Sequence, residues 1–249
     1  MLPADIPGWT GLVVIMLLSL SFHEAAHAFV ADRLGDPTAR RLGRVTLNPL
    51  KHLDPFLSFL LPAVLAWLGA PVFGGGKPVP INVLNFRHKA RDFMLVALAG
   101  PFSNLALAAL FAALFVASAW TGVLPPVVVR NPYGPDQLFY PMFSSMASSG
   151  HAGDFAAYLE LWLKLGVLLN LGLALFNLLP LPPLDGSRVI GWLLPRPLQF
   201  RWYALDRLGI LLVFGLLYFG GLEYVGYGLE WSYNTVGSTI DAIVGVGPT

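Results

Sequence analysis

The chain has 249 residues, of which 56% are hydrophobic and only 12% are charged, and its 15 basic and 14 acidic residues give a net charge of +1. Soluble domains carry roughly 25% charged residues, so this composition predicts an integral membrane protein and excludes the basic surface that nucleic-acid binding needs. The absence of cysteine excludes disulfides and thiolate metal sites, so any zinc site must use His, Asp and Glu.

The first apolar run, residues 8–31, is long enough to cross a bilayer, which takes about 20 mostly apolar residues. No Lys or Arg precedes this run, and it contains no clear small-residue cleavage site, so we interpret it as a retained span and not as a signal peptide. Further runs of this kind cover residues 92–120, 158–180 and 208–229. The sequence therefore predicts four long transmembrane helices.

Residues 56–80 are harder to assign, because their apolar part is short, contains Pro62 and leads into a stretch rich in Gly and Pro. These features favour a re-entrant or interfacial element. Lys and Arg mark cytoplasmic loops; they cluster on both sides of this region and again after the third span, but residues 121–157 hold only one and residues 230–249 hold none. Both termini then lie outside, provided that residues 56–80 enter and leave on the same side.

We therefore expect an all-α polytopic membrane protein with about four long transmembrane helices and a re-entrant segment that contains a small β element. Residues 1–249 would form a single membrane-embedded domain, with a core at residues 8–195 and an additional C-terminal span at 208–229. The connection at 121–157 is too short for a separate folded domain of ordinary size.

The first span contains the motif HEAAH at residues 23–27. On a helix, residues i and i+4 lie on one face, so His23 and His27 could chelate one zinc ion while Glu24 acts as a general base toward water. Ionisable groups inside a membrane are costly and are functional by default. The motif therefore predicts a metal site near the cytoplasmic end of this span.

A catalytic zinc ion usually has three protein ligands, so a third ligand is expected elsewhere in the chain. Asp185 is the strongest candidate, because it follows three prolines that stop the third span and lies on broken backbone at the depth of the HEAAH motif. The alternative role for Asp185 is the N-cap of a helix that begins near Ser187.

HEAAH together with the later stretch NLLPLPPLDG resembles the paired motifs of the site-2 protease family of intramembrane zinc metalloproteases. The second family motif is N-x-x-P-x-x-x-x-D-G, and it is matched by Asn177, Pro180, Asp185 and Gly186. The stretches GKPVPIN and AGPFSN are also similar to segments of compact bacterial members, so the resemblance extends over about residues 11–195.

This resemblance implies a multi-pass protein of the bacterial plasma membrane that acts in regulated intramembrane proteolysis. His23, His27 and Asp185 would bind one zinc ion per chain, and Glu24 would be the catalytic acid/base. The partners would be transmembrane protein substrates, the lipid bilayer and separate regulatory proteins, with no nucleic acid among them.

Two further sets of residues could contact a substrate. Asn177 and Asn104 lie at the predicted depth of the site, where they could stabilise an oxyanion or simply form hydrogen bonds between helices. Val79 and Ile81 alternate on either side of a proline, so their stretch could pair with an extended substrate at a sheet edge, or it could be an irregular interfacial loop.

The motifs leave other functions to consider. A non-catalytic zinc-binding membrane protein that holds client helices would share the ligands, although the intact Glu24 favours the protease. A transporter should contain internal repeats with paired broken helices, and neither motif has a second copy. The apolar surroundings of the HEAAH motif exclude a soluble zinc protease.

Overall fold

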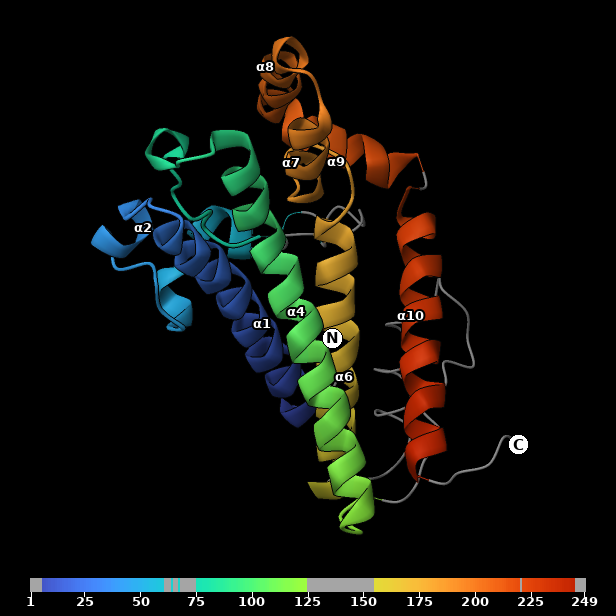
Figure 1. The fold of residues 1–249 in the computed structure, drawn as a ribbon. Coiled ribbons are helices and arrows are strands. Elements are labelled where there is room, and N and C mark those ends of the chain that lie inside the picture. Colours follow the sequence, from blue (N-terminus) through green and yellow to red (C-terminus); the bar gives the residue numbers. More distant parts are fainter. Residues whose placement is uncertain are drawn as a thin grey trace. The chain divides into compact units, whose positions relative to one another are not determined.

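The structure is a computed structural model that describes residues 6–60, 64, 67, 75–124, 155–219 and 221–244. The described residues are mostly helical (Figure 1). The longer helices are α1 (Ile6–Arg33), α4 (Lys89–Trp120), α6 (Phe155–Asn177), α9 (Gly209–Tyr218) and α10 (Gly221–Val244). The shorter elements are α2 (Thr38–Arg41), α7 (Gly186–Leu193), α8 (Arg196–Ala204), η1 (Pro49–Lys51), η2 (Pro55–Leu60), η3 (Val83–Asn85) and η5 (Leu205–Leu208).

Among the described residues, three helices are long and apolar enough to cross a membrane: Thr10–Arg33 within α1, all of α4, and all of α6. They agree with three of the four predicted spans. The prediction of one helix over residues 208–229 is wrong, because α9 ends at Tyr218 and α10 begins at Gly221. The sequence carries two consecutive glycines at this break, and glycine disfavours the helix interior.

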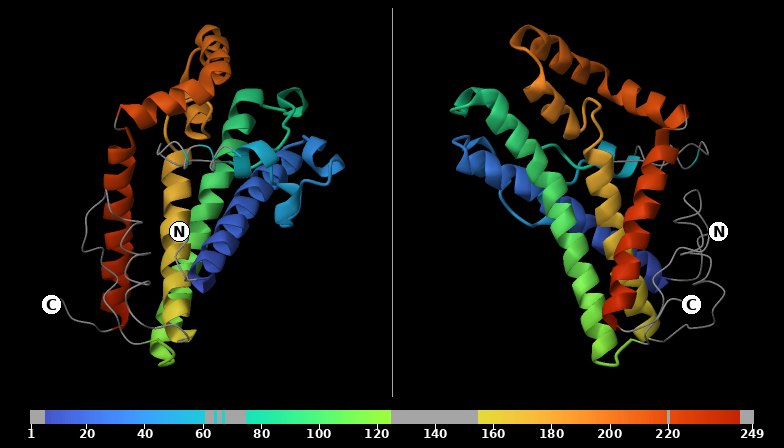
Figure 2. Two further views of the ribbon diagram at one scale, coloured as in Figure 1. Left: turned by 180° about the vertical axis from the view of Figure 1, so that it is seen from behind. Right: turned by 45° about the vertical axis from the view of Figure 1, so that its right-hand side comes forward.

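The chain divides into two compact units. Unit 1 comprises Met1–Met16, Asn104–Leu175 and Gly220–Thr249, and unit 2 comprises Leu17–Ser103 and Phe176–Phe219. The core of unit 1 is formed by buried apolar side chains from three helices that run alongside one another (Figure 2). Phe115 of α4, Leu168 of α6 and Tyr233 of α10 all belong to this core.

Unit 2 contains both sequence motifs. Here the small residues Ala28 and Ala31 of α1 are fully buried, and they let the 79–86 stretch and the start of α4 approach α1 closely. Val79 packs on Ala28, and Val96 of α4 packs in the cluster around Ala31. The helix that carries HEAAH is therefore covered by two segments that follow it in the chain.

The predicted β element is not found, since the part of the chain that the structure describes contains no strand. Residues 75–82 have no regular secondary structure, and most of residues 61–74 lie outside the described residues. Pro78 and Pro80 have no N–H, and the amides of Val79 and Asn82 donate to the carboxylates of Glu24 and Asp36 in place of a neighbouring strand.

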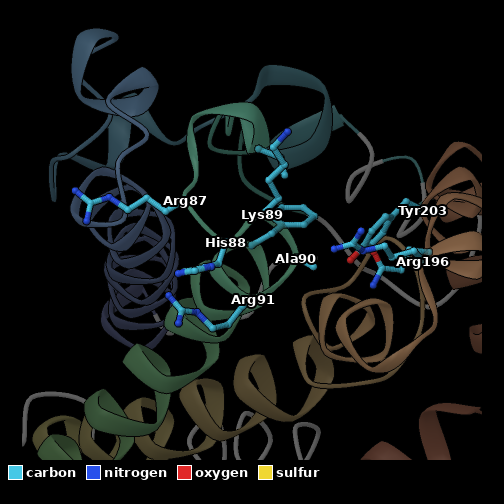
Figure 3. A pocket seen from close by; sticks show the side chains of 10 residues that line it. Arg87, His88, Lys89, Ala90, Arg91, Arg196 and Tyr203 are labelled. Carbon is cyan, nitrogen blue, oxygen red and sulfur yellow. The ribbon is translucent and has the colours of Figure 1, made fainter.

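A cleft of about 740 Å³ lies in unit 2 between the start of α4 and α8 (Figure 3). Basic side chains from both elements surround it, and none of its lining residues belongs to either motif. The lining residues are Val83, Arg87, His88, Lys89, Ala90, Arg91, Phe93, Arg196, Gln199 and Tyr203.

Candidate metal centre

Helix α1 brings the two histidines of the HEAAH motif together in the interior of unit 2. His23 and His27 are buried, with exposed fractions of 6% and 7%. Their rings meet edge to face with centroids 4.6 Å apart, and their Nε2 atoms lie 3.0 Å from each other. The i, i+4 spacing therefore produces the arrangement that the sequence predicts.

The orientation of His27 is set by α4. Its Nδ1 atom lies 2.7 Å from the carbonyl oxygen of Val96. Because a carbonyl can only accept a hydrogen bond, Nδ1 must carry a proton, and Nε2, which faces His23, is the nitrogen left to bind a metal. A histidine that binds a metal commonly donates its other N–H in this way, which fixes its tautomer.

Gly100 allows α4 to approach both imidazoles. A Cβ atom at this position would lie 2.4 Å from Nε2 of His27 and 2.6 Å from Cε1 of His23. No side chain can occupy that space unless the histidines move. The stretch AGPFSN resembles segments of the family, but nothing in the sequence indicated that Gly100 lies against the histidines.

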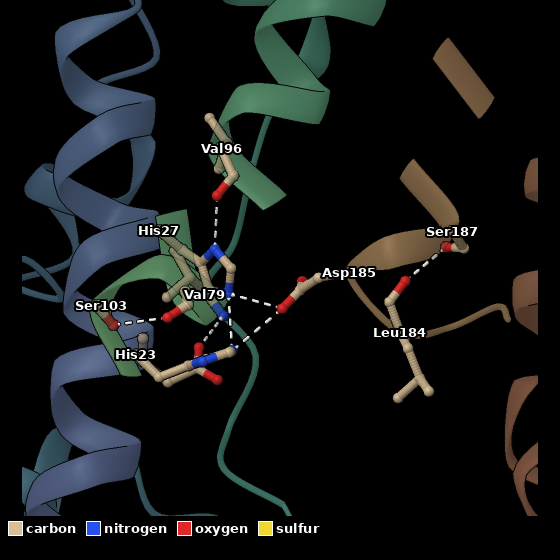
Figure 4. A network of polar contacts seen from close by, with 10 residues as sticks. His23, His27, Val79, Val96, Ser103, Leu184, Asp185 and Ser187 are labelled. Atoms are coloured by element: carbon tan, nitrogen blue, oxygen red, sulfur yellow. Dashed lines mark hydrogen bonds and ion pairs between the residues drawn. The ribbon is translucent and has the colours of Figure 1, made fainter. Parts of the chain in front are cut away.

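Asp185 completes the cluster, as Figure 4 shows. Its Oδ2 atom lies 3.2 Å from Nε2 of His23 and 3.4 Å from Nε2 of His27. Asp185 occupies the N-cap position of α7, as the alternative predicted, but its side chain makes no capping hydrogen bond and points to the histidines instead. Asp185 also reaches the histidines from a segment about 160 residues further along the chain.

The turn that presents Asp185 is fixed by close packing. A Cβ atom at Gly186 would lie 2.1 Å from the carbonyl oxygen of Leu178, so only glycine fits this return of the chain. The hydroxyl of Ser187 donates to the carbonyl oxygen of Leu184 at 2.6 Å. The indole Nε1 of Trp202 donates to the carbonyl oxygen of Ser187 at 2.8 Å. These contacts join the start of α7 to α8.

A second set of contacts anchors α7 through Arg188, one turn beyond Asp185. Its Nη1 atom lies 2.7 Å from Oδ2 of Asp206. The guanidinium lies over the ring of Phe93 from α4, 5.0 Å from the ring centroid. Helix α7 is therefore fixed both to η5 and to the helix that carries Val96 and Gly100.

The three converging atoms fit a zinc ion. Tetrahedral ligands at about 2.0–2.2 Å from zinc lie about 3.3 Å from one another, close to the observed 3.0, 3.2 and 3.4 Å. Oδ2 of Asp185 is buried and has no hydrogen-bond partner among the described residues. An oxygen of this kind beside two imidazole nitrogens requires a positive partner, so the cluster could hold a metal ion.

Glu24 lies beside the cluster and not in it. Its side chain is buried, with an exposed fraction of 9%, and Oε2 accepts a hydrogen bond from the amide of Val79 at 3.2 Å. The other oxygen, Oε1, makes no hydrogen bond to the described residues, so it could still accept a proton from a water molecule.

The predicted substrate-contact residues on the 79–81 stretch have mainly packing contacts. Val79 is buried against Ala28 and Ala39, and Ile81 is partly buried in the same cluster. Ile81 is still partly exposed, and the backbone amide of Val79 donates directly to Glu24.

The two asparagines differ in their surroundings. The amide of Asn104 is fully buried and donates to Oδ1 of Asn170 at 2.8 Å, which links α4 to α6 within unit 1. This is the interhelical hydrogen bond that was the alternative to an oxyanion role. Asn177 is the last residue of α6, and its side chain is partly buried.

Comparison with known proteins places this geometry in a family. The profile of peptidase family M50 matches residues 11–216. The chain is 36% identical over 200 residues to the "Putative zinc metalloprotease YwhC" of Bacillus subtilis (strain 168). The matched segment covers 80% of this chain and 76% of that protein.

Two mycobacterial relatives match this chain over only part of their own length. "Putative zinc metalloprotease Rip2" of Mycolicibacterium smegmatis is 42% identical over 42% of this chain and 37% of its own length. "Putative zinc metalloprotease Rip3" of Mycobacterium tuberculosis (strain ATCC 25618 / H37Rv) is 28% identical over 76% of this chain and 35% of its own length. No solved structure matches the chain significantly. The chain belongs to peptidase family M50, the site-2 protease family, and is a zinc metallopeptidase.

Proposed function

We propose that this protein is an intramembrane endopeptidase that binds one zinc ion per chain and cleaves membrane protein substrates in or near their transmembrane segments, in regulated intramembrane proteolysis. The observation that carries the proposal is that Asp185 meets His23 and His27 beside Glu24, and that the two histidines and Glu24 lie on an apolar helix long enough to span a membrane. Such a set of polar groups is costly in a membrane, and ionisable groups found there usually have a function.

In this proposal His23, His27 and Asp185 hold the ion and Glu24 carries the protons. Zinc would polarise the scissile carbonyl and lower the pKa of a water molecule to near neutrality. Oε1 of Glu24 takes the proton from the attacking water and later passes it to the leaving amine. The hydrogen bond from Val79 to Oε2 keeps the carboxylate turned toward the cluster during both transfers. Asn177, inside the second motif, is the proposed donor to the oxyanion.

The proposed substrate path uses the backbone of residues 77–82. A helical substrate hides its amides, so the scissile segment must be extended before attack. This stretch is itself without regular secondary structure, and its Val79 amide touches Glu24. A substrate strand that pairs beside it would therefore lie next to the proposed base.

The proposed topology is a single multi-pass domain over residues 1–249 in a bacterial plasma membrane, with the site near the cytoplasmic face. Gly75 donates its amide to the carbonyl oxygen of Leu57 at 3.1 Å, which supports a chain that returns to its starting point over the re-entrant region. The basic cleft combines residues 87–91 with Arg196, two segments that the charge pattern assigns to the cytoplasm. A fourth crossing after α9 remains part of this proposal.

The test compares the wild type with Glu24→Gln in bacterial cells that lack their own copy of the gene. Newly formed N termini of membrane proteins are identified by mass spectrometry. We expect N termini inside or beside transmembrane segments in the wild type and their loss in Glu24→Gln, with zinc still bound. Cleavage that survives in Glu24→Gln contradicts the mechanism, and no such N termini in the wild type would favour a protein that only holds client helices.

A further inference from the structure

Among the buried charged residues outside the metal centre are Asp36 and Arg44, which have no part in the proposed chemistry. Asp36 is fully buried, and Arg44 has an exposed fraction of 7%. A buried charge is costly unless hydrogen bonds compensate for its lost hydration. Both residues belong to the loop that follows α1, and their hydrogen bonds lead to one place, the stretch of residues 77–82.

Arg44 holds the beginning of this stretch. Its Nη2 atom donates to the carbonyl oxygen of Lys77 at 2.9 Å and to that of Pro78 at 3.2 Å. The amide of Lys77 donates in turn to the carbonyl oxygen of His52 at 2.7 Å. A guanidinium suits this role because it can donate several hydrogen bonds in a fixed plane.

Asp36 holds the other end. One carboxylate oxygen accepts from the amide of Asn82 at 2.6 Å. The second oxygen accepts from Nδ2 of Asn85 at 2.7 Å and from the hydroxyl of Thr38 at 2.5 Å. Hydrogen bonds to an ionised group are about twice as strong as those between neutral groups. The stretch is therefore fixed at both ends by charged side chains, although it belongs to no sheet.

Between these two anchors lies the contact with the proposed base. Val79 packs its side chain on Ala28 of α1, and its amide donates to Oε2 of Glu24 at 3.2 Å. Because this hydrogen bond is the one that the Glu24 carboxylate makes to the described residues, the direction of the carboxylate depends on where residues 77–82 lie. Displacing either end of the stretch would move the donor away.

We infer that Asp36 and Arg44 are positioning residues, which orient the carboxylate of Glu24 by holding residues 77–82 against it. The inference rests on the proposed role of Glu24 as the base. The hydrogen bonds of Asp36 and Arg44 go to residues 77–82 and their neighbours and not to the three proposed ligands, so their effect on cleavage passes through Val79. Loss of a group that orients a catalytic side chain commonly reduces activity by about 10- to 100-fold.

The test measures amide hydrogen exchange at Val79 in the full-length protein, labelled with isotopic valine, by NMR in detergent. Arg44→Gln and Asp36→Asn should each raise the Val79 exchange rate by about tenfold or more, because the amide loses its acceptor. Arg44→Lys should restore part of the protection, since an ammonium can still donate to one carbonyl. The controls are Arg40→Gln and Asp32→Asn, which break an ion pair in the same region without removing either anchor of residues 77–82.

Glu24→Ala should raise exchange at Val79 by itself. Adding Arg44→Gln to it should then have little further effect, because both changes act on one hydrogen bond. In the wild-type background, the rate of appearance of Glu24-dependent N termini should fall about 10- to 100-fold in Arg44→Gln, with zinc content unchanged, and recover in part in Arg44→Lys.

Unchanged Val79 exchange in both variants would overturn the inference, and so would faster exchange with an unchanged cleavage rate. If the wild type produces no Glu24-dependent N termini, the proposed function fails and this inference fails with it. This outcome differs from failure of the inference alone, because Val79 exchange then still responds to Arg44→Gln.

Discussion

The Nδ1 atom of His27 lies 2.7 Å from the carbonyl oxygen of Val96, so a backbone group of α4 sets the orientation of a side chain on α1. Four residues further along α4, Gly100 packs against both imidazoles. The metal centre therefore depends on a helix that contributes no ligand to it. This dependence can be tested by substituting Gly100, which has no side-chain functional group.

Gly100→Ala should weaken zinc binding about tenfold or more, because the added Cβ would overlap Nε2 of His27 and displace the ring. Alanine favours the helix by about 1 kcal/mol over glycine, so a weaker site cannot be attributed to loss of α4. Zinc affinity is measured by competition with a chelator. Gly215→Ala in α9 is the matched control, since a Cβ there meets nothing within 4 Å. Equal affinities in the two variants would contradict the packing argument.

The protein should lose stability in acid because the carboxylate of Asp36 becomes protonated. Burial raises the pKa of its carboxyl group, but hydrogen bonds from Thr38, Asn82 and Asn85 to the charged form outweigh burial and lower it below the usual range. A lowered pKa in the folded state stabilises the fold above the unfolded value of about 3.9, and this stabilisation is lost as the pH falls through the folded pKa.

The Tm of the wild type should therefore exceed that of Asp36→Asn at pH 6, and the gap should narrow as the pH is lowered toward 3. Comparing the two proteins at each pH removes the contribution of every other titrating group. A gap that stays constant or widens in acid would show that the charged form of Asp36 is not the stabilised one.

Asn104→Ala should cost about 1 kcal/mol of stability, because it leaves Oδ1 of Asn170 without this donor inside unit 1. Proteolysis should be retained. Ser118→Ala is the control on the same helix, where an exposed hydroxyl donates to the carbonyl oxygen of Leu114 within the helix. Loss of cleavage in Asn104→Ala at unchanged stability would instead restore the oxyanion role for Asn104.

The parts of the site that could be predicted from sequence are those set by local geometry or by a motif. His23 and His27 follow from the helical repeat, and Asp185 follows from prolines that stop a helix at the same depth. By contrast, the carbonyl oxygen of Val96 has no sequence signature, since every residue has one. The packing of Gly100 on the histidines depends on how two helices meet.

Prediction of the fold from the sequence has the same limit: local features can be predicted, but contacts between distant segments cannot. Hydropathy predicts α1, α4 and α6, because a membrane span is a property of one continuous segment. The alternation of Val79 and Ile81 favoured a strand, but tertiary contacts took precedence: Asp36 and Arg44 supply the hydrogen-bond partners that a neighbouring strand would give. No sequence pattern links either Asp36 or Arg44 to residues 77–82.

The most direct test of the central claim is the zinc content of the purified protein in detergent, measured by elemental analysis beside Asp185→Ala. We expect one zinc ion per wild-type chain and a weakened or lost ion in the variant, because removing the carboxylate leaves two histidine ligands where a catalytic zinc site usually has three. Glu160→Ala, which breaks the ion pair with Lys164 in unit 1 and removes no proposed ligand, is the control. A wild type that binds no zinc even after reconstitution, or a variant that holds zinc as tightly as the wild type, would contradict the proposed site.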